Sequence, residues 1–519
     1  MERHGSESYF VIGEGLLAES LGGRDETLPP ALAAAAPAAP PPFRFSRMGP
    51  KGTAKQLGEP NRRKIAQAMT PDNLQAGTIP AGYTYVGQFI DHDLSFDETA
   101  LLEGVDIKPA DILSARSPSL DLDCLYGLGP QDPGSAKFYE ADGLHLKMGS
   151  ADGGPAGNKF DLPRVGVGTA AARRMALIPD KRNDENLAVG QTHLAMIRFH
   201  NRVVDTLPAS VPAAQRFTEA RKKVVMHYQW MIRTDFLPRI CAPAVVTNVF
   251  SQGRKAFEVG APPDQVPTMP VEFSVAAFRL GHAMIRADYK WNKHFPNATL
   301  AELFEFSGLS GTLGGGQRLP SIWIADFRRL FNFGQRTPPP PALVVPASKF
   351  NRAMRIDTKL VNPLRQLPVP DPNPRKNLAY RNLARANMVK LATGQQMAAF
   401  LRSKGVAVTT LTKAQVRNGA NGAKLDALTT PQRNALVTNT PLWFYILREA
   451  ELNQGRLKGV GARIVAETFH RAMEASKNSI VREPSFRPSL GPNNTTFRMV
   501  DLLFFAFQGQ AALLNPNGN

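Results

Sequence analysis

Apolar side chains recur at helical spacing through most of this 519-residue chain, and alternating strand patterns are scarce. In segment 185–206, for example, Leu187, Leu194, Ile197 and Val204 fall near one stripe of a helix. The other segments with a helical pattern are 212–236, 271–287, 375–403 and 442–475. The sequence therefore predicts a mainly α fold, with one large helical domain, long loops and very little strand.

An Ala/Pro tract, LPPALAAAAPAAPPP at 28–42, separates the N-terminal region from the rest of the chain. A tract of this composition cannot form a packed core. We therefore expect residues 1–45 to be a flexible tail, 46–510 to be one domain and 511–519 to be a C-terminal tail. The many remaining prolines and glycines are expected in long connections, which often build functional sites.

Composition excludes several classes of protein. Cys124 and Cys241 are the only cysteines, too few for a disulfide framework or a structural zinc site. The net charge of +18 could attract anionic partners, but the basic residues are dispersed, so no specific nucleic acid is expected. No apolar stretch approaches the length of a membrane-spanning helix. MERHGSESYFVIGEGLLAES at 1–20 lacks the pattern of a secretory signal, which predicts a cytoplasmic protein or export by another route.

The segment GQFIDHDL (87–94) brings together polar side chains if it is helical. Gln88, Asp91 and His92 are then spaced i, i+3 and i+4 and share one face. An amide, a carboxylate and an imidazole on one face form an unusually polar stripe. A histidine flanked by two aspartates can also be an ordinary surface or hydrogen-bonded residue.

The segment PDKRNDEN (179–186) precedes the long helical pattern. Arg182 and Glu185 are spaced i, i+3 and are therefore neighbours on a helix. Acidic side chains at a helix start also interact favourably with the helix dipole, which is the purely structural explanation.

Oxygen-bearing side chains recur at every second residue in SPSLDLDCLYG (117–127). They are Ser117, Ser119, Asp121 and Asp123. Ca²⁺ takes six to eight oxygen ligands, and a loop of this kind can supply several. A solvated acidic turn would have the same composition.

Two further segments carry a candidate ligand and a candidate partner for it. In AAFRLGHAMIR (276–286) an apolar helix contains one histidine, His282, directly after Gly281, and a small residue lets a flat ligand approach the backbone. In YRNLARANM (380–388), Asn382 could orient an imidazole, and Arg385 could pair with a carboxylate. A core histidine and an exposed helix face are the alternatives.

Taken in order, these segments resemble the animal-type haem peroxidase superfamily, to which myeloperoxidase, lactoperoxidase and the cyclooxygenases belong. The resemblance runs from about residue 80 to 475 and looks most like the bacterial branch. It includes HLAMIRFHNRVVD (193–205), YQWMIRTDFLPRI (228–240) and PLWFYILREAE (441–451). The resemblance implies haem b, calcium, and a peroxidase that reduces hydrogen peroxide and oxidises small organic donors or (pseudo)halides.

On the distal side of the haem, the resemblance implies a role for each polar residue. His92 corresponds to the distal histidine, Gln88 to the glutamine that holds distal water or halide, and Arg182 to the distal arginine. Asp91 and Glu185 occupy the positions where mammalian members esterify the haem methyl groups, so one or two covalent links are implied.

On the proximal side, the resemblance implies that His282 is the iron ligand and that Asn382 accepts its ring N–H. Arg385 corresponds to the arginine that pairs with a haem propionate, and Arg279 to a position near the proximal side.

The calcium site of the family corresponds to residues from two segments. Asp93, Ser117, Asp121 and Asp123 match its ligands, and Ser119 would supply its backbone carbonyl.

The chain departs from the family pattern at two positions. The residue after Glu185 is Asn186 rather than methionine, so a sulfonium link to the haem is not expected. Arg279 stands where a cyclooxygenase has its radical tyrosine, which argues against fatty-acid oxygenation by that route.

Two alternative functions remain open. A fatty-acid dioxygenase on the same scaffold would need a tyrosyl radical from elsewhere, such as Tyr228 or Tyr289. A basic binding protein with a degenerate haem site would not need His92, Arg182 and His282 together. The sequence therefore favours a peroxidase.

Overall fold

The computed structural model describes residues 43–53, 57–72, 74–97, 106–155, 157–367 and 372–519. Most of the regular structure is helical, and the buried apolar side chains form one continuous core. The mainly α prediction is confirmed. The α-helices are α2 (Glu59–Ala68), α3 (Gly82–Leu94), α4 (Asp123–Tyr126), α5 (Ala170–Arg174), α6 (Leu187–Asp205), α7 (Arg216–Met231), α8 (Leu237–Ile240), α9 (Pro243–Gln252), α10 (Gly281–Met284), α11 (Leu300–Glu305), α12 (Phe327–Leu330), α13 (Leu378–Met388), α14 (Gly394–Ser403), α15 (Lys413–Asn418), α16 (Thr430–Thr438), α17 (Leu442–Leu452), α18 (Gly459–Ala475), α19 (Met499–Ala506) and α20 (Ala511–Leu514).

Short helical turns of other kinds join these helices. Two are π-helical, η6 (Ile232–Phe236) and η7 (Phe273–Ala277). The 3₁₀ turns are η2 (Pro109–Asp111), η3 (Ala136–Phe138), η4 (Lys181–Asp184), η5 (Ala213–Gln215), η8 (Phe278–Leu280), η9 (Ser321–Trp323), η10 (Phe333–Gln335), η11 (Pro341–Leu343), η12 (Ala347–Lys349) and η13 (Asn362–Arg365).

The strands are short and form three small sheets. They are β1 (Phe43–Ser46), β2 (Ala76–Pro80), β3 (Leu113–Ser114), β4 (Met269–Pro270), β5 (Asp288–Tyr289), β6 (Ala298–Thr299) and β7 (Arg352–Met354). β1 lies between β3, which is antiparallel to it, and β4, which is parallel. β2 pairs with β7 and β5 with β6, both antiparallel.

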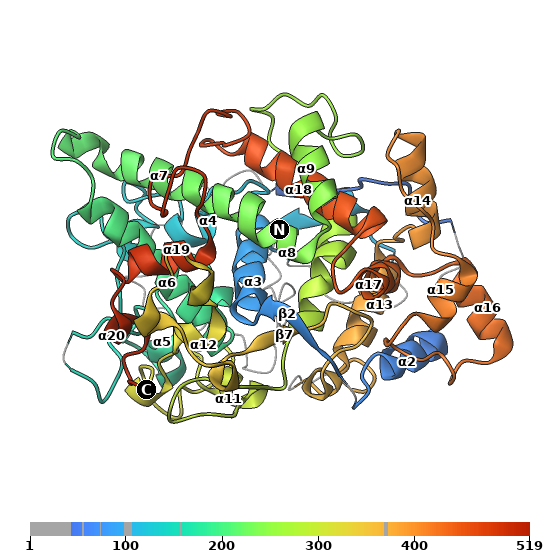
Figure 1. Cartoon of the computed structure of the whole chain (residues 1–519), viewed down its shortest axis with the longest axis horizontal. Coiled ribbons are helices and arrows are strands. Elements are labelled where there is room, and N and C mark those ends of the chain that lie inside the picture. Colours follow the sequence, from blue (N-terminus) through green and yellow to red (C-terminus); the bar gives the residue numbers. More distant parts are fainter. Residues whose placement is uncertain (1–42, 54–56, 73, 98–105, 156, 368–371) are drawn as a thin grey trace.

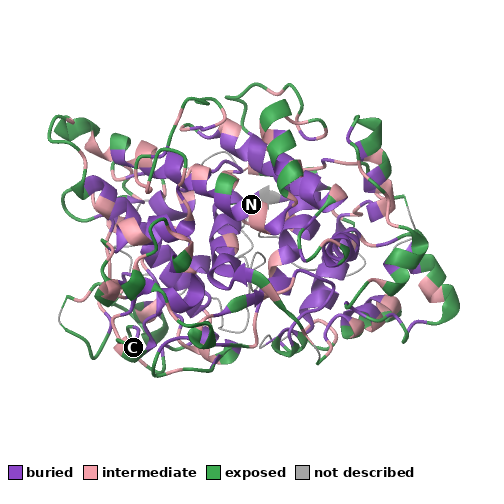
Figure 2. Ribbon diagram, viewed as in Figure 1, coloured by how far each residue is buried: buried purple, intermediate pink, exposed green. Residues whose placement is uncertain are grey.

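Helix α3 lies near the middle of the molecule, with α6, α7 and α19 on one side and α13 and α17 on the other (Figure 1). It contacts α4, α6, α10, η4 and β7. Every residue of α3 except Gly87 is buried. Buried residues dominate this central region, and exposed ones gather in the outer helices and loops (Figure 2). The polar face predicted at 87–94 therefore lies in the core.

Three of the predicted helices are interrupted. The segment 271–287 folds as η7, η8 and α10 instead of one α-helix. In 375–403 the helix ends after Met388, and Thr393 begins α14 by forming a reciprocal capping box with Gln396. In 442–475, Gln454 and Gly455 follow the end of α17 with φ of 58° and 80°, which separates this helix from α18. Hydrophobic periodicity alone does not reveal such breaks.

The ends of the domain differ from the predicted boundaries. Residues 1–42 of the predicted N-terminal tail lie outside the described residues, but Phe45 is buried in β1. In the predicted C-terminal tail, Leu514 is buried in α20, and Asn519 accepts a hydrogen bond of 2.6 Å from Arg328. Phe45 at one end, and Leu514 and Asn519 at the other, therefore contact the packed domain.

Neither cysteine is part of a disulfide, and both are buried. Burial raises the pKa of the Cys124 thiol, with further contributions from Asp93 and Asp123, and burial alone raises that of Cys241. Both thiols therefore stay protonated at neutral pH. None of the helices that the structure describes is long and apolar enough to cross a bilayer.

The first residue of α3 is in close contact with the core. A Cβ atom added at Gly82 would lie 2.2 Å from Cζ of the Phe331 ring, which is itself buried. No side chain larger than hydrogen fits unless α3 or the ring moves.

We predict that Gly82→Ala lowers the free energy of unfolding by about 1–3 kcal/mol, the usual cost of overpacking. Helix propensity alone would favour alanine, so a loss must come from the contact. Urea unfolding of Gly82→Ala, Phe331→Leu and the double variant measures this. The double variant should lose less than the sum of the single variants, and full additivity would contradict the contact.

Candidate active site

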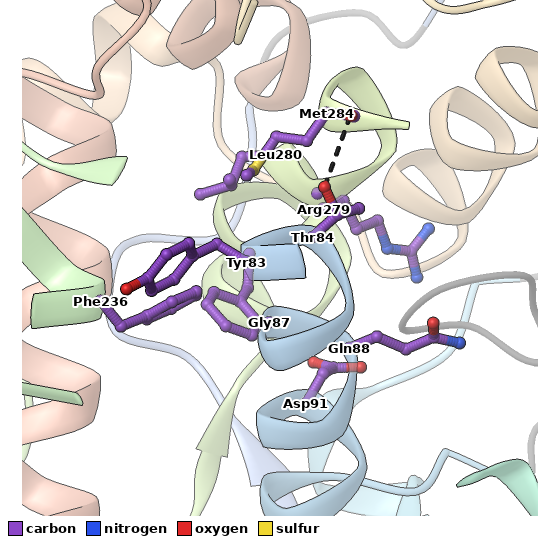
Figure 3. A pocket seen from close by; sticks show the side chains of 11 residues that line it. Tyr83, Thr84, Gly87, Gln88, Asp91, Phe236, Arg279, Leu280 and Met284 are labelled. Atoms are coloured by element: carbon purple, nitrogen blue, oxygen red, sulfur yellow. Dashed lines mark hydrogen bonds between the residues drawn. The ribbon is translucent and has the colours of Figure 1, made fainter. Parts of the chain in front are cut away.

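One cavity lies between α3 and the segment that carries His282. Its lining includes Gln88 and Asp91 from α3, and Arg279, Gly281 and Met284 from η8 and α10. In Figure 3, Gln88, Asp91 and Arg279 point to the same side of α3. The hydroxyl of Thr84 donates a hydrogen bond of 3.4 Å to the Met284 carbonyl, which joins the two walls.

His92 is completely buried and has a defined tautomer. Its Nδ1 lies 2.9 Å from Oδ1 of Asn183, and an amide oxygen can only accept a hydrogen bond. The proton is therefore on Nδ1, and Nε2 keeps its lone pair, with no hydrogen-bond partner among the described residues. Burial, followed by the nearby Arg182 charge, lowers the pKa of His92 to about 3. The arrangement is that of a neutral imidazole able to accept a proton.

Gln88 is fixed from both ends of its amide. Its Nε2 donates a hydrogen bond to Glu185 Oε1, and its Oε1 accepts one of 3.0 Å from Asn186. Glu185 Oε1 also lies 3.8 Å from Nε2 of His92. The prediction that Gln88 and His92 share a site with Glu185 agrees with these contacts, and Asn186 contributes an unpredicted contact.

Arg182 lies beside the backbone of His92 instead of its ring. Its guanidinium forms a 2.7 Å ion pair with Asp180 and donates a hydrogen bond of 3.0 Å to the His92 carbonyl. It also stacks over Phe96, with 4.1 Å between Cζ and the ring centroid. A charged group is thereby held at the end of α3.

Sequence reasoning missed two residues of this region, Asp180 and Asn183. Asp180 caps η4 by accepting a hydrogen bond from the Arg182 N–H, and it also binds the guanidinium. Asn183 directly follows Arg182 and reaches His92. The Asp-x-Arg spacing was a visible signal for the first contact. Nothing in the sequence indicated that Asn183 would meet a residue 91 positions away.

Asp91 is the acidic residue that lines the cavity. Its Oδ2 has no hydrogen-bond partner among the described residues. Burial raises the pKa of Asp91 to about 7, against the opposing effect of Arg182. A substantial fraction of this carboxyl group is therefore protonated at neutral pH.

On the other wall, His282 is fully buried and contacts Asn382. Its Nδ1 lies 2.9 Å from Nδ2 of Asn382, and Oδ1 of Asn382 accepts a hydrogen bond of 2.9 Å from Arg279. The structure places the predicted partner Asn382 beside the ring of His282. Arg279 can only donate, so it contacts the amide oxygen of Asn382.

Arg279 belongs to a group of buried arginines that also includes Arg381 and Arg385. Burial lowers the pKa of Arg279 well below its usual value, and the charges of Arg385 and Arg381 lower it further. Arg385 lies 3.7 Å from Asp97. Arg381 was not predicted, although it stands one residue before Asn382. The group concentrates positive charge close to the His282 contact.

The acidic oxygen cluster, defined as Asp93, Asp121 and Asp123, is a second candidate site. One oxygen from each carboxylate lies within 4.8 Å of the others. Both oxygens of Asp93 and one from each partner accept no well-formed hydrogen bond within the described part of the chain. Burial raises the pKa of Asp93, and the charges of Asp123 and Asp121 add to this effect.

The two predicted serines lie in the loop that carries this cluster. The Ser117 N–H donates a hydrogen bond of 3.2 Å to Asp123, and the Ser119 carbonyl accepts one of 3.0 Å from the Asp121 N–H. The structure therefore brings the residues of this loop to Asp93 at the end of α3.

Comparisons with known proteins agree with this geometry. Residues 96–307 match the family model for animal haem peroxidases. Thyroid peroxidase of Rattus norvegicus is 28% identical over 213 residues, which are 38% of this chain and 23% of that protein. A peroxidase-like protein of Margaritifera margaritifera is 31% identical over 110 residues, 21% of this chain and 14% of that protein. The matched regions thus span less than a quarter of these relatives.

The fold is also shared with solved structures. Peroxidase A of Dictyostelium discoideum aligns with a TM-score of 0.59 at 15% identity, covering 91% of this chain and 94% of that one. Fatty acid alpha-dioxygenase of Arabidopsis thaliana aligns with a TM-score of 0.58 at 12% identity, covering 91% and 78%. Residues 96–307 therefore resemble the animal haem peroxidase domain, in agreement with the predicted family, and the described chain shares its fold with a solved peroxidase.

The residues present fit the haem that this family implies. The two helices on either side of the cavity each carry a buried histidine, His92 on α3 and His282 on α10, next to the lining residues Asp91 and Gly281. The absence of a Cβ at Gly281 leaves room beside His282, and the arginines around Asn382 would attract the carboxylates of such a ligand.

We predict that His92 of the haem-free protein is neutral, with its proton on Nδ1, from pH 5 to 8. The physical reasons are its hydrogen bond to Asn183 and the lowering of its pKa to about 3 by burial. Long-range ¹H–¹⁵N NMR of deuterated protein with labelled histidine measures the tautomer, and His92→Gln assigns the signal. Asn183→Ala should mix the tautomers. An imidazolium signal at pH 6 would contradict the prediction.

Proposed function

We propose that this chain is a haem-dependent peroxidase that reduces hydrogen peroxide and oxidises a small organic donor or a (pseudo)halide. The observation that carries the proposal is His92, a neutral buried imidazole whose Nε2 lone pair is not engaged in a hydrogen bond among the described residues. Such a group accepts a proton and then returns it, as peroxide cleavage requires.

His282 would hold the iron of haem b, and Arg385 would pair with a propionate. Asn382 would fix the plane of the His282 ring through their 2.9 Å contact. Bound haem would supply the redox-active iron at which peroxide is cleaved. Arg279 would act indirectly, because it holds the Asn382 amide oxygen.

His92 would move the proton between the two peroxide oxygens. Its Nε2 takes the proton from one oxygen and delivers it to the other, which leaves as water. Asn183 keeps the second ring proton on Nδ1 throughout, so the imidazole stays in the orientation that both transfers need. Gln88, held by Glu185 and Asn186, would position water or a halide beside it.

Arg182 would stabilise the negative charge that develops on the departing oxygen. Its permanent charge lies beside His92, and Asp180 fixes the guanidinium, so little reorganisation is needed during the reaction. Donors that stabilise such charge typically contribute about 3–4 kcal/mol.

Asp91 and Glu185 are the residues we propose for one or two ester links to the haem. Asp91 supports this proposal because it lines the cavity and its carboxyl group is partly protonated at neutral pH. Glu185 supports it less directly, since its carboxylate contacts Gln88 and approaches His92.

The acidic oxygen cluster is the site we propose for Ca²⁺, with Ser117 and the Ser119 carbonyl as further ligands. Carboxylates that lie within 4.8 Å of one another, with buried oxygens that accept no well-formed hydrogen bond among the described residues, suit a hard cation. Because Asp93 follows His92 directly, a bound ion would also hold the end of α3 in place.

We predict that wild-type protein reconstituted with haemin shows a Soret band and that His282→Ala loses most of this absorbance. Asn292→Ala, a substitution of a buried polar residue with backbone contacts to Ile322 and Ile324, is the control for general destabilisation and should keep the band. Acid–acetone extraction then tests the ester links, since linked haem stays with the protein. An unchanged Soret band in His282→Ala would remove this ligand from the proposal.

We predict that Arg182→Ala slows the peroxide-induced Soret change by about two orders of magnitude or more, as measured by stopped flow. Arg328→Ala is a matched control, because Arg328 binds Asp326 with the same Asp-x-Arg geometry, at 2.9 and 3.0 Å. Its other hydrogen bonds go to Ala342 and Asn519, whereas Arg182 donates to the His92 carbonyl. Equal rates in wild type and Arg182→Ala would exclude Arg182 from the mechanism.

The dioxygenase alternative keeps some support from the fold, because a fatty acid alpha-dioxygenase has a similar one. Arg279 occupies the position of the expected radical tyrosine and is held by Asn382 and the Ser274 carbonyl. Tyr228 and Tyr289 do not line the cavity described above. Oxygen uptake with an unsaturated fatty acid, without a peroxide donor, would favour the alternative.

A further inference from the structure

We infer that Arg116 is a positioning residue that couples the acidic oxygen cluster to Arg182, so that a cation bound in the cluster controls the availability of Arg182. The inference rests on the proposed haem and calcium sites and adds a regulatory link between them. Arg116 belongs to neither site.

A continuous series of ion pairs joins the two sites. Arg116 Nη1 lies 3.9 Å from Asp123 Oδ2, and Arg116 Nε lies 2.8 Å from Asp180 Oδ2. The same Asp180 oxygen lies 2.7 Å from Arg182 Nη2. Asp180 is therefore shared by two arginines, one facing the cluster and one facing His92.

These groups have little freedom to rearrange in other ways. The exposed fraction of the side chain is 13% for Arg116, 1% for Asp180 and 4% for Arg182. Arg116 Nη2 also donates a hydrogen bond of 2.8 Å to the Pro179 carbonyl, next to Asp180. Ion pairs that are shielded from water interact more strongly than exposed ones. A change in the charge of Asp123 therefore alters the interaction between Arg116 and Asp180.

The direction of the effect follows from the charges. A divalent cation at Asp123 repels Arg116 and takes over part of the Asp123 charge, so Arg116 shifts its interaction toward Asp180. Asp180 then holds Arg182 less strongly, and Arg182 can interact with an anion on the His92 side. Without the cation, Arg116 divides its charge between both aspartates, and Asp180 binds Arg182 more tightly.

Fluoride binding to the ferric haem protein tests this link, because fluoride is a small anion stabilised by a nearby positive charge. In wild type, saturating calcium chloride should strengthen fluoride binding by at least about fivefold relative to protein in EDTA, within the range of known couplings. By linkage, fluoride should strengthen calcium binding by the same factor.

Arg116→Gln should reduce this coupling to less than about twofold, the remainder passing through Asp93 and the His92 backbone. Calorimetric calcium titration gives a readout that a merely structural role would not produce. Because the variant removes a positive charge 3.9 Å from Asp123, calcium should bind at least as tightly as in wild type. Damage to the fold would instead weaken calcium binding. Arg116→Lys keeps the charge and should retain part of the coupling.

Arg164→Gln is the matched control. The Arg164 side chain is 7% exposed and pairs with Asp161 at 2.6 Å and with Asp184, which lies in η4 near Arg182, but it forms no ion pair with Asp180 among the described residues. This variant should keep the wild-type coupling.

Wild-type coupling near one, unchanged coupling in Arg116→Gln, or weaker calcium binding in that variant would each overturn the inference. A normal Soret band and normal fluoride binding without calcium dependence would leave the proposed peroxidase function intact. Failure of the wild-type protein to bind haem would overturn both.

Discussion

The burial of a polar helix is the constraint on which the rest of the site depends. Helix α3 passes through the core and carries Gln88, Asp91, His92 and Asp93 into it. A buried polar group is costly unless it is hydrogen-bonded or binds a ligand. The turn before α6 supplies Asn183 for His92 and Glu185 for Gln88. Asp91 and Asp93 retain oxygens without well-formed hydrogen bonds among the described residues, one toward the cavity and the other in the acidic oxygen cluster. These are the positions at which we propose a haem link and a cation.

The side of the cavity that carries His282 differs from α3, because the buried polar side chains near His282 are mainly arginines. Arg279 is anchored by the Ser274 carbonyl of the π-helical turn η7 and by the Asn382 amide oxygen. In a continuous α-helix over 271–287, the carbonyls would pair regularly along the axis. The irregular turns instead combine a buried guanidinium with a histidine three residues later. Asn382 contacts both Arg279 and His282. The orientation of its amide therefore depends on Arg279, and Arg279 in turn affects the surroundings of His282.

Much of this arrangement could be predicted from the sequence. The features that could not be predicted each have a physical reason. The mainly α fold follows from hydrophobic spacing, and the order of the motifs indicated which segments would meet. Helix breaks such as those before α14 and α18 were missed, because apolar periodicity continues across them while the capping of Thr393 and the positive φ of Gly455 interrupt the backbone. Asn183, Arg116 and Arg381 were missed for another reason. Their roles come from contacts with distant residues, and an isolated Asn or Arg in a sequence has many equally good surface explanations.

The state of the two thiols has a consequence for the proposed use of peroxide. Peroxide attacks the thiolate form of cysteine, and the reaction needs access to the sulfur. Cys124 and Cys241 are both buried, and both have raised pKa values. Cys124 directly follows Asp123, so sulfenic acid formation there would put a bulky polar group beside the proposed cation ligands. Keeping that sulfur protonated and buried would protect the proposed cation site from the peroxide that the proposed activity consumes.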